Sequence, residues 1–165
     1  MMQFDLEERV EKARRLFKEG GYNCCQAVVL AYNDLFGLDD TLAASLSSGF
    51  GGGMGRMREV CGSVSGMVML CGLAAPADNP SAKSDRTRNY ALVQEVAGEF
   101  RKLNGSIVCK ELLGLVPMGT VSPAPAESPE PSDRTPEYYK KRPCEELVGI
   151  SARIIGEKLL KMDYR

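Results

Sequence analysis

The stretch "LEERVEKARRLFKEGGYNCCQAVVLAYNDLFG", residues 6–37, predicts two consecutive helices joined by a glycine turn. In the first, apolar residues recur from Leu6 to Phe17 at three- and four-residue steps, with charged residues between them. That period is typical of an amphipathic helix with one face in the core. The glycine pair at 20–21 ends this helix, and Asn23 can cap the next one.

The same helical period continues through most of the chain, and no alternating strand pattern interrupts it. We expect further helices at about 38–48, 61–74, 85–103, 107–114 and 143–161. A chain of 165 residues is long enough for one domain with its own hydrophobic core. The sequence therefore predicts an all-α fold, a compact single domain over residues 1–165 with about six to seven helices.

Two segments interrupt the helical pattern. Residues 115–143 hold seven of the nine prolines, mixed with Ser, Glu and Ala, and we expect a loop or tether without a core of its own. The other segment, "GFGGGMGR" at 49–56, lacks the Gly-Lys-Ser/Thr and the preceding strand of a nucleotide loop. We expect its backbone to approach a cofactor near Cys61 and to offer N–H groups to sulfur. The cofactor-binding residues predicted here are Gly52, Gly53 and Gly62.

The charge balance argues against a nucleic-acid partner, because 21 basic residues face 22 acidic ones and the formal net charge is −1. The most apolar stretch, at 66–77, is far shorter than the roughly 20 residues of a membrane span. We therefore expect a cytoplasmic protein that binds neither nucleic acid nor membrane. The sequence leaves open whether the chain forms a homo-oligomer. Cysteines remain reduced in the cytoplasm, so six of them favour metal or redox chemistry over structural disulfides.

Four of the six cysteines stand at predicted helix starts: Cys24, Cys61, Cys109 and Cys144. Unpaired N–H groups and the partial positive charge of a helix start favour a thiolate. The effect is worth roughly 0.3 to 2 kcal/mol, so a thiol pKa near 8.5 falls only to about 7 or 8. A bound metal would deprotonate these thiols outright. Four cations could assist if the fold brings them close: Arg56, Arg58, Lys110 and Arg142.

The other two cysteines have weaker claims to a function. Cys71 lies in the middle of a predicted helix and is expected in the core. Cys25 points about 100° around its helix from Cys24, which leaves it a supporting role or none. Free cysteine often serves only to fill buried space, so a helical domain with six inert thiols stays open as well.

The spacing of the cysteines excludes several familiar sites. The chain has no Cys-x-x-Cys and no histidine, so it carries no thioredoxin motif, zinc-ribbon knuckle, c-type haem site or Cys–His pair. If the four helix-start thiols meet, a thiolate-rich site suits zinc or an iron–sulfur cluster.

Five segments together resemble a family described as redox-active and named for its cysteine pattern, C–GCAxxG–C–C. They are "GYNCCQAV", "GFGGGMGR", "CGSVSG", "GSIVCKELLG" and "RPCEELV". The resemblance runs from about residue 4 to the final helix and implies that Cys24, Cys61, Cys109 and Cys144 are the family's four cysteines. Related sequence in the cluster-binding part of split-Soret cytochromes points to iron–sulfur chemistry. Ser63 stands where the pattern has alanine, a small change expected to leave the helix start undisturbed, and Cys25 stands where alanine is more usual.

From these features we expect a thiol-based redox or electron-transfer protein with an unidentified redox partner protein. Its four helix-start cysteines would bind a metal or iron–sulfur centre, or cycle between dithiol and disulfide. Cys144, beyond the proline-rich tether, would be the mobile member. Whether the chain is an oxidoreductase enzyme stays open. The alternative is a structural zinc module that mediates protein interaction.

Overall fold

The structure is a computed structural model that describes residues 1–121 and 127–163. Its helices are α1 (Leu6–Lys18), α2 (Cys24–Leu30), α3 (Asp40–Ser47), α4 (Gly51–Met54), α5 (Gly62–Ala74), α6 (Lys83–Asn104), α7 (Cys109–Leu112), α8 (Pro136–Lys141) and α9 (Cys144–Lys161). Within the described residues the only β-type pairing is one isolated bridge, between Val60 and Val108. The predicted all-α fold is confirmed, with six helices of seven residues or more.

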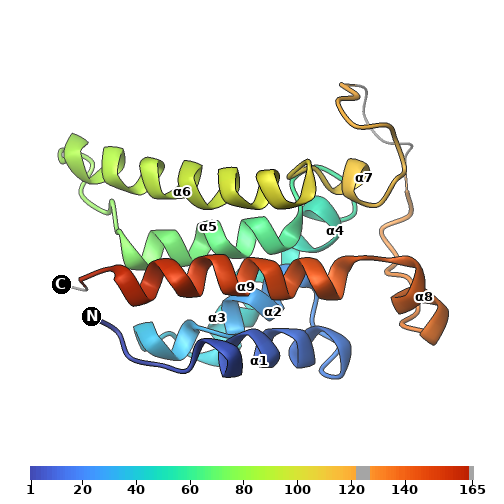
Figure 1. The fold of residues 1–165 in the computed structure, drawn as a ribbon, viewed down its shortest axis with the longest axis horizontal. Coiled ribbons are helices and arrows are strands. Elements are labelled where there is room, and N and C mark those ends of the chain that lie inside the picture. The colour runs from blue at the N-terminus through green and yellow to red at the C-terminus, as the bar shows by residue number, and fades with distance from the viewer. Residues whose placement is uncertain (122–126, 164–165) are drawn as a thin grey trace.

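The long helices lie roughly parallel to one another, with α5 between α6 and α9 (Figure 1). Helix α1 packs along α9, and α2 packs along α5. Both chain termini lie at one end of the molecule, whereas α5, α7 and α9 all start at the opposite end (Figure 1). This topology brings the starts of several helices together, and with them the cysteines that begin those helices.

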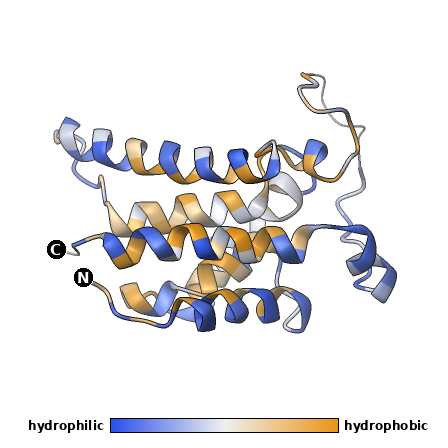
Figure 2. Cartoon of the chain, viewed as in Figure 1, coloured by the Kyte–Doolittle hydropathy of each residue, from blue (hydrophilic) through white to orange (hydrophobic). Residues whose placement is uncertain are grey.

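Helix α5 can lie at the centre of the fold because its residues are small or apolar on every side. A helix without a polar face is stable only when other elements cover it. At Gly66 an added Cβ would lie 2.9 Å from Val28 Cβ, so the absence of a side chain lets α5 approach α2 closely. In Figure 2 the outer helices α1 and α6 carry hydrophilic stripes, which α5 lacks. No helix in the described part of the chain is both long and apolar enough to cross a bilayer.

The proline-rich region contains a helix that the sequence pattern did not reveal, α8. Thr135 caps it by accepting a hydrogen bond from the N–H of Tyr138 at 3.2 Å, and Pro136 occupies its first turn. Arg134 donates to the backbone carbonyls of Phe17 and Tyr22, each over 3.2 Å. Residues 134–143 are thereby held against the helical body, and residues 122–126 of the expected tether lie outside the described residues.

Candidate functional site

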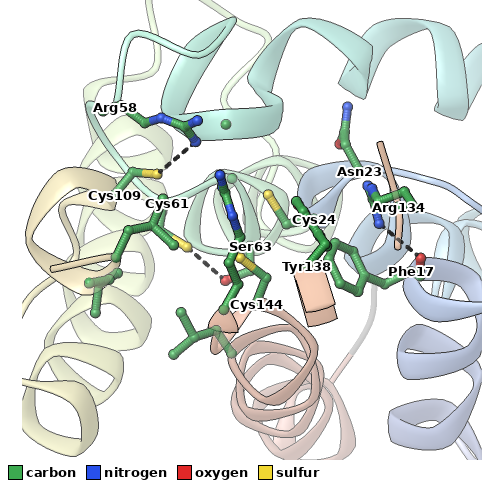
Figure 3. A pocket seen from close by; sticks show the side chains of 16 residues that line it. Phe17, Asn23, Cys24, Arg58, Cys61, Ser63, Cys109, Arg134, Tyr138 and Cys144 are labelled. Carbon is green, nitrogen blue, oxygen red and sulfur yellow. Dashed lines mark hydrogen bonds between the residues drawn. The ribbon is translucent and has the colours of Figure 1, made fainter. Parts of the chain in front are cut away.

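The four helix-start cysteines all line one cavity of about 60 Å³, which we call the thiol pocket. Figure 3 shows the sulfur atoms of Cys24, Cys61, Cys109 and Cys144 around this common space. Cys61 and Cys109 are buried, Cys24 and Cys144 are partly exposed, and all six cysteines are free thiols. The four cysteines at predicted helix starts are therefore the ones that the fold brings together.

Cys25 and Cys71 lie outside the thiol pocket. The sulfur of Cys25 packs in a small apolar cluster, 3.8 Å from the sulfur of Met69. Cys71 is fully buried in the main core, as its mid-helix position predicted. Both therefore have packing environments that account for them without chemistry.

Cys24 owes its position to the helix cap that precedes it. The side chain of Asn23 accepts from the N–H of Gln26 at 2.9 Å, and the Gln26 side chain accepts from the N–H of Asn23 at 3.0 Å. This reciprocal capping box starts α2 at Cys24. Asn23 also donates to the carbonyl of Ser48 at 2.9 Å, which ties the start of α2 to the residue just before the glycine-rich loop.

Cys61 and Cys109 are joined through the backbone. The N–H of Cys61 donates to the carbonyl of Ile107 at 2.8 Å, and the N–H of Cys109 donates to the carbonyl of Glu59 at 2.6 Å. These two bonds pair the segments that lead into α5 and α7. Two cysteines far apart in the sequence are thereby fixed side by side at the start of their helices.

The three predicted glycines surround the sulfurs and give them room. An added Cβ at Gly62 would collide with the sulfur of Cys24, and one at Gly53 would lie 2.6 Å from Cys109 Cβ. Gly52 lines the thiol pocket with a φ of 67°. Within the glycine-rich loop, the N–H of Arg56 donates to the carbonyl of Gly51 at 3.3 Å, and the predicted donation of loop N–H groups to sulfur stays a prediction. The contact of these three glycines with a cofactor stays a prediction.

Cys61 has a hydrogen-bonding partner that sequence reasoning missed. Its sulfur lies 3.2 Å from the hydroxyl of Ser63, and the hydroxyl of Ser151 on α9 donates to Ser63 at 2.9 Å. Both serines are fully buried. With the Ser151 proton directed at Ser63, the Ser63 hydroxyl is free to donate to the sulfur. The expectation that Ser63 only replaces a small alanine therefore understated its role.

Arginines surround the thiol pocket. Arg58 is buried, and its Nη1 donates toward the sulfur of Cys109 over 3.9 Å. Arg134 and Arg142 also line the cavity. Of the cations expected to assist the thiols, Arg58 and Arg142 stand beside them, whereas Arg134 was not foreseen.

Residues 22–158 match a protein-family model described as "Putative redox-active protein (C_GCAxxG_C_C)". The chain belongs to this family. No curated protein and no solved structure matches it. The family description supports redox chemistry and names no metal, so the roles of the individual cysteines stay predictions.

In this family member, burial sets the ionisation of the pocket thiols. Burial, followed by the charge of Cys24, raises the pKa of Cys144 to about 12 and also raises the pKa of Cys61. For Cys109, burial raises the pKa and outweighs the lowering effect of Arg58. The expected fall of these pKa values at helix starts is therefore reversed. These three thiols stay protonated at neutral pH unless another species takes their protons.

The donor chemistry of the thiol pocket fits a thiophilic metal centre. Four sulfurs line it, together with arginines and apolar side chains, and among the residues that the structure describes no carboxylate lines it. In residues 1–121 and 127–163, no three Cys, Asp or Glu side chains stand close enough together to hold one metal ion. The sulfurs surround the cavity instead of converging on one point.

Proposed function

We propose that this protein is a redox protein in which Cys24, Cys61, Cys109 and Cys144 act as one redox group. One observation carries the proposal: thiols from four separate parts of the sequence line a single cavity. Membership of a family described as redox-active supports it. Cys25 and Cys71, which lie outside the cavity, take no part.

The form we favour is an iron–sulfur centre held by the four thiolates. When bound, such a cluster would take up and release single electrons. The support comes from the donor set, because four thiols and no described carboxylate line the cavity. Burial acts against metal binding, since the raised pKa values mean that a metal must displace the thiol protons. Four thiolates make a site negative, and the nearby guanidinium groups of Arg58, Arg134 and Arg142 offset that charge.

The chain itself would contribute hydrogen bonds and exclusion of water. Arg58 donates toward the sulfur of Cys109, and Ser63 can donate to the sulfur of Cys61. Hydrogen bonds to sulfur and burial are among the features that set the potential of a cluster. The side chains of Phe17, Leu112 and Leu147 form an apolar part of the lining of the thiol pocket.

Dithiol–disulfide cycling is the second candidate, supported by the free state of all four pocket thiols and by the lack of a three-ligand group in the described parts of the chain. Two thiols would become one disulfide, and two protons and two electrons would pass to a disulfide of a cytoplasmic partner protein. Cys24 is the natural shared member, because its charge contributes to the raised pKa values of the other three: second to burial at Cys61 and Cys144, and after burial and the opposing Arg58 at Cys109.

The decisive experiment is purification without oxygen, followed by metal and sulfide analysis and a visible absorption spectrum. We expect iron, acid-labile sulfide and a visible band that Cys61→Ala abolishes. Cys71→Ala, which removes a buried thiol outside the pocket, is the matched control and should leave the band intact.

Other outcomes select the alternatives. A colourless, metal-free protein with a reversible two-electron oxidation, lost in Cys61→Ala, would establish disulfide cycling. Bound zinc without redox activity, and unfolding on chelation, would instead establish a structural zinc module that mediates protein interaction. A protein that binds no metal and whose pocket thiols resist oxidation would overturn the proposed function.

A further inference from the structure

A second cavity, of about 340 Å³, adjoins the thiol pocket and is bordered by four guanidinium groups. We call it the arginine pocket; its arginines are Arg56, Arg58, Arg134 and Arg142. Three of them, all but Arg56, also line the thiol pocket, so the two cavities share a wall. No acidic side chain belongs to the described lining of the arginine pocket. The cavity is therefore strongly positive and opens beside the proposed redox group.

One carboxylate of the chain itself binds two of these arginines. Oε2 of Glu127 accepts from Arg58 Nη2 at 2.7 Å, from Arg58 Nε at 3.0 Å and from Arg56 Nη2 at 3.2 Å. Glu127 thus places an anion where the guanidinium groups converge. The Nε atom of Arg56 remains buried without a hydrogen-bond partner. One carboxylate leaves most of the positive charge of four arginines unbalanced.

The backbone beneath these arginines is strained. In the described parts of the chain, only three residues other than glycine have a positive φ: Met54 at 67°, Arg56 at 66° and Arg58 at 60°. Such a conformation is unfavourable for residues other than glycine and persists where the surrounding structure enforces it. Here the side chains of Arg56 and Arg58, two residues apart, both reach Oε2 of Glu127.

We propose that the arginine pocket is a binding site for the carboxylate or oxyanion group of a small molecule, and that Glu127 is its internal competitor. Planar guanidinium groups match the geometry of carboxylates and phosphates. The Glu127 side chain is 24% exposed, whereas that of Arg58 is 4% exposed. An incoming anion can therefore displace the partly exposed carboxylate while the buried Arg58 stays in place.

The site also has a direct connection to the thiols. Arg58 donates both to Glu127 and toward the sulfur of Cys109. If the redox function proposed above holds, the bound anion is the charged group of a small redox substrate, held beside Cys109. Anion binding itself does not depend on that function.

The test is a calorimetric titration of the full chain, with its thiols kept reduced, at constant ionic strength. Acetate probes for a carboxylate ligand and inorganic phosphate for an oxyanion. Glu127→Gln should tighten binding of the preferred anion roughly fivefold or more, because the internal competitor is gone. Glu130→Gln, a change of the same charge on the same segment, should bind like the wild type.

Two arginine variants provide an independent test should Glu127→Gln fold poorly. Arg56→Gln and Arg142→Gln should each weaken anion binding. Equal affinity in all these variants, or no binding of either anion, would overturn the site. Cys61→Ala should retain anion binding even though it removes a proposed redox ligand, so failure of the redox function and failure of this site give different results.

Discussion

At the scale of single residues, the surroundings of each sulfur decide how it behaves. Cys61 lies beside a serine hydroxyl, Cys109 beside the guanidinium of Arg58, and Cys24 where a side chain at position 62 would otherwise stand. Three of the four pocket sulfurs therefore have different local contacts, while the charge of Cys24 acts in common on Cys61, Cys109 and Cys144.

The Ser63 hydroxyl should influence the ionisation of Cys61. In Ser63→Ala we expect the pKa of Cys61 to rise further, because the hydrogen bond from Ser63 opposes the effect of burial. The Ser151 hydroxyl would lose its acceptor, at a cost of about 1–3 kcal/mol in stability. Alkylation of Cys61, followed by mass spectrometry against pH in reduced, metal-free protein, measures the effect. Ser65→Ala on the same helix is the control, and equal Cys61 rates in the two variants would contradict the role of Ser63.

Two glycines of α5 should respond to alanine in opposite ways. Gly62→Ala places a methyl group against the sulfur of Cys24 and 2.8 Å from the carbonyl oxygen of Phe50. Such overpacking typically costs about 1–3 kcal/mol. Gly72 has open space around it, and alanine in a helix is more favourable than glycine by about 0.5–1 kcal/mol. Urea unfolding should show one loss and one gain; two changes of the same sign would refute this account.

At the scale of elements, the helix starts place the thiols but do not ionise them. A helix start favours a thiolate by less than about 2 kcal/mol. Burial acts in the opposite direction and prevails at Cys61, Cys109 and Cys144. The helix starts matter because three-dimensional packing brings them to one end of the molecule (Figure 1).

The cap of α2 should hold Cys24 in place. Asn23→Ala removes the capping box and should cost about 0.5–2 kcal/mol, while Cys24 becomes faster to alkylate as the first turn loosens. Asp39→Ala is the matched control, because Asp39 caps α3 by accepting from the N–H of Leu42 at 3.0 Å, away from the thiol pocket. It should lose similar stability in urea without a change at Cys24. If both variants accelerate Cys24 equally, the cap is not what positions this thiol.

At the scale of the whole molecule, the buried thiols make the stability of the fold depend on pH. Burial raises the pKa of Cys71 and Cys144 from 9.0 to about 12 and also raises those of Cys61 and Cys109. The folded state thus holds these protons more tightly than the unfolded state does. Its stability is complete below the unfolded thiol pKa and is lost as pH rises through the folded values.

We therefore expect the free energy of unfolding of the reduced, metal-free protein to fall between about pH 9 and 12. Urea unfolding at several pH values measures this loss. Cys71→Ala should make the fall shallower, because one titrating thiol is gone. A centre that binds the pocket thiols as thiolates should reduce the dependence further. A constant free energy above pH 9 would mean that the thiols do not titrate as their burial implies.

The helices and the cysteine set could be predicted from the sequence because both depend on local patterns. An apolar residue every three or four positions favours a helix wherever it occurs, so the stretch from Leu6 to Phe17 was sufficient for α1. The four functional candidates were identified by their positions at helix starts and by the family pattern. The helix α8 escaped notice because prolines dominate its surroundings, although Thr135 and Pro136 are a normal start signal.

By itself, then, the sequence determined the all-α fold and the cysteines that meet. Only the tertiary structure decided what surrounds them: Ser151 behind Ser63, Arg58 beside Cys109, and Glu127 across the arginine pocket. It also decided that these thiols resist ionisation. The reason is that helix formation depends on neighbours within a few residues, whereas burial and charge pairing depend on atoms that are distant in sequence and meet only after the chain has folded.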